Sequence, residues 1–434
     1  MLTVNYIREN TALIKERLTK RGFKLMDKID EAVVLDDKRK ATQSELDNLL
    51  AESNAASKQV GQLMKAGKRE EAEQIRNQVT QNKEAIKTLQ TALDNTKNEL
   101  LEVLYLIPNV PHQSVPAGQS DEDNEVFKIG YESLPELSPD ASLPHWELAK
   151  KHDIIDFETG VKITGAGFPL FKGKGAQLKR ALINFFLYEA SQAGYLEVMP
   201  PHLVNEASAF GTGQLPDKEG QMYYTGQAKG KDGALVDDFY LIPTAEVPIT
   251  NIYRNVIVDK NDFPIRLCGH TPCFRREVGS YGKDVRGLNR VHQFDKVEIV
   301  QITHPDTSYD TLHEMLAHIE GLLQKLELPY RILRLCGGDL GFVSALTYDF
   351  EVYSAAQKKW LEVSSVSNFE TFQSNRLKLR FRNDDKKNQL AHTLNGSALA
   401  LARIVACLLE NHQVADGVNI PEALRAYTRF DKID

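Results

Sequence analysis

The stretch CFRREVGSYGKDVRGLNRVHQFDKVEI, residues 273–299, places a strand-like segment on each side of a glycine-bearing loop. Arg275 and Glu277 come before the loop, and Glu298 comes after it. Because side chains in a strand alternate between its two faces, we expect Arg275 and Glu277 to share one face and Arg276 to take the other. A sheet face that joins a guanidinium to carboxylates suits a ligand carrying both an anion and an amine.

A second pair of polar residues, further upstream, could form a similar polar face. Thr244 and Glu246, in PTAEV at 243–247, would also share a face if this segment is a strand. Solvated strand faces with ordinary surface ion pairs would produce the same pattern. Periodicity alone therefore leaves a binding surface and a plain charged surface both open.

The chain around these segments alternates strand-like and helical patterns. Apolar spacing predicts helices near residues 178–186 and 312–326. Strands are predicted for LIPTAEV (241–247), IRLCGHTPCF (265–274), KVEIVQIT (296–303), YRILRLC (330–336), YDFEVYS (348–354) and WLEVSSVS (360–367). Several strands follow one another without helices between them, which favours a mainly antiparallel sheet flanked by helices over a βαβ fold. The fold class is α+β.

The first hundred residues have a different character. From about Asp27 to Val103 there is no proline, and the glycines are Gly61 and Gly67. A 4-3-4-3 spacing runs through Ile75, Val79, Asn82, Ile86, Leu89, Leu93, Thr96, Leu100 and Val103, and more weakly through Leu35, Arg39, Thr42, Leu46, Leu49, Ser53, Ala56, Val60 and Leu63. This spacing predicts two antiparallel coiled-coil helices joined near Gly67, each roughly 55–60 Å long.

Composition shifts divide the chain into three parts. The helical hairpin takes residues 1–105, a proline-bearing acidic linker takes 106–142, and the sheet domain takes 143–434. The N-terminus has no apolar signal-peptide core, and no apolar run is long enough to span a membrane. We therefore expect a cytoplasmic protein.

Net charge leaves the class of partner open, whereas cysteine spacing and missing motifs argue against several kinds of catalytic or metal site. The chain has 434 residues and a formal net charge of −7, so a local basic strip for a polyanion is neither indicated nor excluded. Cys268, Cys273, Cys336 and Cys407 fit no zinc-binding spacing, and they are expected to be reduced and buried. The sequence contains no phosphate-loop, GxSxG or HExxH motif.

The stretch at 273–299 resembles motif 2 of the class II aminoacyl-tRNA synthetases, and its HQFDKVE ending, with PTAE upstream, is similar to the seryl-tRNA synthetases. GYLEVMPPHLV at 194–204 resembles motif 1, with its proline at Pro201. NGSALALAR resembles the start of motif 3, over 395–410. The heptad hairpin resembles the family's tRNA-binding arm, so the resemblance covers essentially the whole chain.

The resemblance implies ATP-dependent activation of L-serine to seryl-adenylate, followed by transfer of the seryl group to the 3′ end of tRNA-Ser, with tRNA-Sec as a further candidate. Arg275 and Arg403 are the implied catalytic residues, and Arg275 would bridge the α-phosphate and the serine carboxylate. The implied ATP-binding residues are Arg275, Arg276, Glu277, Val291, Phe294, Glu362, Val363, Ser364, Ser365 and Arg403. A core position for Phe294 and a buried ion pair for Arg403 are the simpler structural alternatives.

The resemblance also implies a serine site and a magnesium ion. Thr244, Ala245, Glu246, Glu298 and Ser397 would hold serine, although Thr244 could equally cap a turn and Ser397 a helix. Glu362 and Ser365 would bind Mg²⁺. Strand alternation disagrees, because an offset of three residues puts Ser365 opposite Glu362, so a bulge or a twisted strand end would be needed. No zinc is expected.

Three further expectations concern partners. Gly279, Gly282 and Gly287 fit a mobile motif 2 loop, whose contacts would be Lys283, Asp284 and Arg286. The family resemblance implies a homodimer formed through motif 1. Candidate tRNA-phosphate contacts on the arm are Lys58, Lys65, Lys68, Arg69 and Arg76, which are also ordinary residues for a coiled-coil exterior.

Two other classes of protein share much of this pattern. One is a relative that activates an amino acid and loads a carrier protein, although such an enzyme would not need the long hairpin. The other is a non-catalytic RNA-binding or coiled-coil interaction protein. That reading predicts loss of the charged strand positions, yet Arg275, Glu298, Glu362 and Arg403 are all present.

Overall fold

The computed structural model describes residues 1–217, 219–226, 239–278 and 286–434. The loop residues Gly279, Gly282, Lys283 and Asp284 lie outside these ranges. The chain divides into two compact units. One comprises residues 1–19 and 23–108, and the other comprises residues 20–22 and 109–434.

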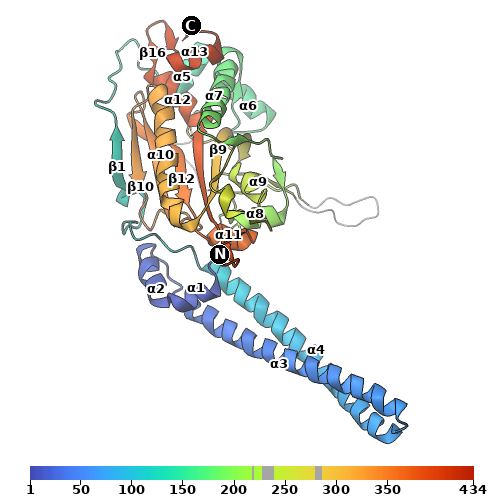
Figure 1. Ribbon diagram of the computed structural model, residues 1–434. Coiled ribbons are helices and arrows are strands. Elements are labelled where there is room, and N and C mark those ends of the chain that lie inside the picture. The colour runs from blue at the N-terminus through green and yellow to red at the C-terminus, as the bar shows by residue number, and fades with distance from the viewer. Residues whose placement is uncertain (218, 227–238, 279–285) are drawn as a thin grey trace. The chain divides into compact units, whose positions relative to one another are not determined.

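The first unit is dominated by the predicted helical hairpin. Helix α3 (Asp27–Lys65) and helix α4 (Arg69–Leu106) pack against each other along their length (Figure 1). The turn between them includes Gly67, whose φ of +75° suits a residue without a Cβ. Every residue of the two predicted seams is buried or half-buried, which confirms the coiled-coil hairpin.

The base of the hairpin carries the short helices α1 (Val4–Glu9) and α2 (Thr11–Lys20). Here α3 contains a buried acid, Asp36, which forms ion pairs with Arg8, Arg39 and Lys40. Burial alone would raise the Asp36 pKa, but the three cations lower this pKa to about 2.

The second unit is built on an eight-stranded sheet, part of which is labelled in Figure 1. All its neighbouring strands are antiparallel except β4 and β8, which are parallel. In spatial order the strands are β1 Glu125–Gly130, β10 Tyr330–Arg334, β11 Leu346–Ser354, β12 Lys359–Asn368, β15 His392–Ala400, β9 Gln293–Thr303, β8 Ile265–Phe274 and β4 Leu196–Glu197. The predicted mainly antiparallel sheet is confirmed, and β1 comes from the stretch expected to be a linker.

Helices cover this sheet and bury its apolar side chains in one large core. Helices α7, α10 and α12 contact its central strands, and α7 and α10 correspond to the two predicted helices. The described helices of this unit are α5 His145–Lys151, α6 Phe157–Ile163, α7 Gly173–Gln192, α8 Glu206–Thr212, α9 Glu246–Asn251, α10 Ser308–Lys325, α11 Phe372–Leu377, α12 Leu401–Asn411 and α13 Glu422–Thr428. All four cysteines are free and buried.

Short strands complete the unit outside the main sheet. Strand β2 Ile155–Asp156 pairs with β3 Leu170–Phe171, and β5 Leu203–Val204 pairs with β6 Tyr240–Leu241. Two three-stranded sheets contain β7 Ile257–Val258, β13 Arg380–Arg382 and β14 Asn388–Leu390, and β16 Gln413–Val414, β17 Gly417–Asn419 and β18 Lys432–Ile433.

Three local predictions are wrong. The segment with Thr244 and Glu246 is not a strand, because the chain leaves β6 at Leu241 and begins helix α9 at Glu246. Strand β8 ends at Phe274, so the alternation argument does not apply to Arg275 and Glu277, which lie beyond it.

The third concerns Ser397. It lies within β15 and is not a helix cap, because the strand continues to Ala400 before α12 begins. Thr244 does accept a hydrogen bond from the backbone N–H of Glu246, at 3.3 Å, so its role as a local cap is confirmed.

Candidate active site

A cavity of about 530 Å³ opens at the motif 2 hairpin and reaches β12, β15 and the start of α12. This volume suits a small-molecule ligand. Most residues predicted for the site line it: Thr244, Glu246, Arg275, Glu277, Val291, Phe294, Glu298, Glu362, Val363, Ser364, Ser365, Ser397 and Arg403. The fold thus brings together charged residues from distant parts of the chain.

The antiparallel pair β8 and β9 holds the arginine end of this cavity. The Arg275 Nε donates to the carbonyl oxygen of Pro243 at 3.2 Å, and the guanidinium carbon lies 5.3 Å from the centre of the Phe294 ring. Glu277 adopts a φ of +47° and accepts a hydrogen bond from Arg290 Nη1 at 3.0 Å. Arg275 and Glu277 therefore face one cavity although they do not share a strand.

A buried polar group closes the deeper end. The ammonium of Lys296 lies 2.5 Å from Glu298 Oε2 and donates to Thr244 Oγ1 at 2.7 Å. Glu298 Oε1 is buried without a hydrogen-bond partner. A buried acceptor without a protein partner is costly and is available to a cationic or hydroxyl-bearing ligand.

Glu246 contributes a second buried carboxylate. Its Oε1 accepts a hydrogen bond from Gln373 Nε2 at 2.6 Å. Burial, and then the neighbouring charge of Glu298, raises the pKa of Glu246 to about 7. Burial also raises the pKa of Glu298, against the opposing effect of Lys296. Placing a cation between these two acids would relieve their repulsion.

A bulge in β12 settles the orientation of Glu362 and Ser365. Glu351 pairs with Glu362 and Asp349 pairs with Ser365, so Val363 is the extra residue. Because Asp349 and Glu351 are two residues apart in β11, their partners share one face. The bulge required by the strand argument is therefore present.

An acidic residue stands opposite Ser365 in the adjacent strand. Burial, and then the charge of Glu362, raises the pKa of Asp349 well above its ordinary value. One Asp349 carboxylate oxygen, Oδ1, is buried without a partner. Among the described residues, no group of three or more His, Cys, Asp or Glu forms a ready metal site.

Arg403 reaches the cavity from the first turn of α12. Its Nε donates to the carbonyl oxygen of Asn289 at 3.0 Å, and its Nη1 donates to the carbonyl oxygen of Glu362 at 2.6 Å. It also lies 3.5 Å from the Glu362 carboxylate. These contacts fix the guanidinium beside residues 286–289, which we call the returning segment because they follow the motif 2 loop.

Two predicted residues do not line the cavity. Arg276 is exposed, and its backbone N–H donates to the carbonyl oxygen of Gln221. Ala245 is fully buried between Thr244 and Glu246. On the other unit, the candidate tRNA contacts Lys58, Lys65, Lys68, Arg69 and Arg76 are all exposed near the hairpin turn.

Sequence reasoning missed Lys296 and Asn289. Strand alternation held a usable signal for Lys296, because it lies two residues before Glu298 in β9 and so shares its face. Asn289 had no such signal, because its contact with Arg403 depends on packing between distant segments.

Within the residues that the structure describes, no helix is long and apolar enough to cross a membrane.

Comparisons with known proteins cover both units. Residues 1–111 match the family model of the seryl-tRNA synthetase N-terminal domain. Residues 231–412 match that of the class II tRNA synthetase core domain (G, H, P, S and T). A serine–tRNA ligase from Salinibacter ruber is 47% identical over 435 residues, covering 100% of this chain and 99% of its own length. One from Neisseria meningitidis serogroup B is 46% identical, covering 98% of each chain.

Solved structures agree over the whole length. A seryl-tRNA synthetase from Pyrococcus horikoshii complexed with ATP has a TM-score of 0.88 and 33% identity, covering 100% of this chain and 99% of its own. A cytoplasmic serine–tRNA ligase from Naegleria fowleri in complex with AMP has a TM-score of 0.86 and 27% identity, with the same coverage.

Proposed function

The chain belongs to the seryl-tRNA synthetase family, and we propose that its cavity and its helical hairpin divide the work of a serine–tRNA ligase. The protein is an aminoacyl-tRNA synthetase that uses ATP to join serine to tRNA-Ser. The observation that carries the residue assignments is the meeting of Arg275, Glu298 and Arg403 around one cavity.

In the first step the serine carboxylate attacks the α-phosphorus of ATP, and pyrophosphate leaves. The protein supplies position and charge rather than a covalent nucleophile. Arg275 lies between the serine end and the Phe294 ring, so its guanidinium would pair with both the α-phosphate and the attacking carboxylate. Phe294 and Arg403 would stack on the two faces of adenine, and Glu277 would accept from its amino group.

A hydroxyl at the 3′ end of tRNA then attacks the seryl carbonyl, and AMP leaves. Serine itself would be held by Thr244, Glu246 and Glu298, and Lys296 would hold Glu298 in place through their ion pair. Alanine lacks the hydroxyl and would leave buried polar groups unpaired, so we expect strong rejection. Threonine must be excluded by shape.

The wall formed by β11 and β12 offers oxygen atoms that would suit a magnesium ion. Glu362 and Ser365 share a face, and the partnerless oxygen of Asp349 stands across from Ser365. Two carboxylates and a hydroxyl are hard oxygen ligands, and Mg²⁺ commonly completes its shell with water and substrate phosphates. When bound, the ion would neutralise phosphate charge, while Glu362 and Ser365 would hold it.

The compact unit made of residues 1–19 and 23–108 is the proposed tRNA-binding arm. Its five exposed bases near the hairpin turn would contact phosphates, and its length suits recognition of RNA shape. The same arm could also bind tRNA-Sec, which is a further candidate substrate of the enzyme.

A homodimer through motif 1 is supported by the apolar side chains exposed there. Met199 is 91% exposed and Leu196, on the edge strand β4, is 65% exposed. Large exposed apolar side chains beside a sheet edge suit an interface between two copies. We expect Met199→Asp to shift wild-type dimers to monomers in sedimentation velocity. A wild-type monomer would contradict the proposal. We also propose a cytoplasmic location, which the tRNA substrate and the free cysteines support.

The test of the activity is pyrophosphate exchange with each amino acid, followed by charging of total tRNA and of purified tRNA-Sec. Serine should drive exchange far above alanine and threonine, and serine should then appear on tRNA-Ser. Exchange without any tRNA charging would favour a carrier-protein ligase. A lack of exchange with every amino acid would favour a non-catalytic protein.

A further inference from the structure

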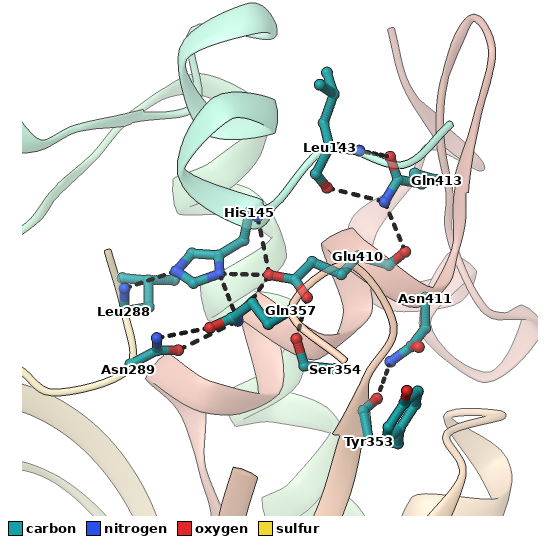
Figure 2. Close-up of polar contacts among 10 residues, drawn as sticks. All are labelled: Leu143, His145, Leu288, Asn289, Tyr353, Ser354, Gln357, Glu410, Asn411 and Gln413. Carbon is teal, nitrogen blue, oxygen red and sulfur yellow. Dashed lines mark hydrogen bonds and ion pairs between the residues drawn. The ribbon is translucent and has the colours of Figure 1, made fainter. Parts of the chain in front are cut away.

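A buried carboxylate, Glu410, lies at the far end of helix α12 from Arg403. Its side chain is fully buried and accepts hydrogen bonds from the backbone N–H of His145 at 3.0 Å, from Gln357 Nε2 at 2.9 Å and from the Ser354 hydroxyl (Figure 2). It also lies 2.7 Å from His145 Nδ1. Burial alone would raise the Glu410 pKa, but the bonds from His145 and Ser354 hold that pKa below its ordinary value.

The hydrogen bonds of His145 assign its tautomer. Its Nε2 accepts the backbone N–H of Leu288 at 2.8 Å, so Nε2 carries no proton. Its Nδ1 therefore bears the ring proton and donates to Glu410. By binding the Nδ1 proton, the Glu410 carboxylate leaves Nε2 as the hydrogen-bond acceptor, and the Leu288 N–H donates to it. Figure 2 shows the ring between the two.

The returning segment, residues 286–289, packs closely against His145. Gly287 has a φ of +68°, and a Cβ added there would lie 2.2 Å from His145 Nε2. The guanidinium carbon of Arg286 lies 4.6 Å from the centre of the Trp146 ring. Helix α5, through His145 and Trp146, thus contacts three consecutive residues of the segment, Arg286, Gly287 and Leu288.

The same segment continues into the ATP end of the cavity. The Asn289 side-chain amide donates to Gln357 Oε1 at 2.8 Å, and the Asn289 backbone carbonyl oxygen accepts from Arg403 Nε at 3.0 Å. Leu288, Asn289 and Arg403 all line the cavity. Arg403 and Glu410 are seven residues apart on α12, which is about two turns, so both lie on the side that faces this segment.

We propose that His145 is a positioning residue for nucleotide binding, which holds residues 286–289 and thereby the Arg403 guanidinium, with Glu410 fixing its tautomer. This inference rests on the proposed adenine site at Phe294 and Arg403. Neither His145 nor Glu410 touches substrate in this arrangement. Both act through the backbone of Leu288 and the carbonyl of Asn289.

Two substitutions of His145 separate the two hydrogen bonds. His145→Gln can place an acceptor near the Nε2 position for Leu288, whereas His145→Asn can donate to Glu410 but cannot reach Leu288. We expect His145→Asn to raise the Kd for ATP about tenfold, the typical effect of losing one buried hydrogen bond. His145→Gln should stay within about threefold of wild type. The KM for serine should change little in either variant.

The measurements are equilibrium ATP binding and the KM values for ATP and serine in pyrophosphate exchange, with melting temperatures alongside. His412→Gln is the control, because this half-buried histidine bonds the Leu326 carbonyl, outside the cavity lining. Unchanged ATP binding in His145→Asn would overturn the proposal. So would ATP binding weaker in His145→Gln than in His145→Asn, or equal increases in both KM values.

Gly287→Ala carries the same test if His145→Asn does not fold, because its methyl group would collide with His145. We expect weaker ATP binding there too, and unchanged binding would count against the proposal. A double-mutant cycle of His145→Asn with Arg403→Lys should give less than additive losses, whereas additive losses would overturn the link. ATP binding is measured without serine, so a wild type that binds ATP but fails to activate serine would refute the proposed function and leave this inference testable.

Discussion

The hairpin and the cavity use charge in opposite ways. Near the turn of the hairpin, bases and acids are exposed, and pairs such as Lys68 with Glu71 are only three residues apart in sequence. In the cavity, Lys296 and Glu298 are almost completely buried and meet Thr244 from a distant segment. Exposed local pairs contribute little to stability, whereas buried charges require partners. The charges that can be lost without harm to the fold are therefore the ones free to contact a partner macromolecule.

The largest expected effect is on catalysis, when a charged side chain of the cavity is removed. Arg275→Ala should lower serine-dependent pyrophosphate exchange about 10³-fold, because the developing charge on the α-phosphate loses its donor. The melting temperature should stay near that of wild type. Arg380→Ala, whose Nε donates to the nearby carbonyl of Lys378, is the control and should retain full exchange. Normal exchange by Arg275→Ala would refute its assignment.

The second effect should appear on the hairpin alone. Replacing its five candidate bases by serine should lower kcat/KM for tRNA-Ser about 100-fold and flatten its salt dependence, because phosphate contacts are lost. Exchange without tRNA should not change. The control removes exposed bases of the other unit, Arg382, Lys386 and Lys387. Equal tRNA charging by both variants would remove the arm from the mechanism.

The pH dependence of serine binding should distinguish a buried acid from an exposed one. Glu246 has a pKa of about 7, raised by burial and by Glu298, so its carboxyl is neutral below that pH and charged above it. A neutral carboxyl cannot pair with the serine ammonium, so the KM for serine should rise about tenfold per pH unit below 7. Glu246→Gln should remove this dependence. A flat wild-type profile between pH 6 and 8 would contradict the assignment.

The smallest effect concerns the one buried acid at the base of the hairpin. Asp36→Asn should lower the free energy of unfolding of its unit by about 1–2 kcal/mol, because three cations lose their shared anion. Asp37→Asn is the matched control, since this neighbour also pairs with Arg8 but is exposed. Its effect should be smaller than that of Asp36→Asn.

The stabilising effect of Asp36 should depend on pH in a defined direction. The Asp36 pKa is lowered from 3.8 to about 2, so its contribution is present above about pH 4 and is lost as pH falls towards 2. Thermal unfolding of wild type and Asp36→Asn should therefore converge at low pH. A constant difference between them would rule out the ionised carboxylate as the cause.

The amino-acid sequence predicts the hairpin, the mainly antiparallel sheet and many of the charged and polar residues that line the cavity. Heptad spacing and strand alternation are local properties, because each follows from the repeat of a single helix or strand. The resemblance of the motifs to those of the synthetase family pointed to Arg275, Glu298, Glu362 and Arg403. Local patterns failed where Thr244 and Glu246 leave a strand for a helix.

The positions of those side chains relative to one another depend on the tertiary structure. The bulge at Val363 turns Glu362 and Ser365 to one face, and the packing of α5 against the returning segment joins His145 to Leu288. The raised pKa of Glu246 likewise exists only in the folded chain. Burial and contacts between residues far apart in sequence set these properties, because both depend on the whole fold and on no single segment's periodicity.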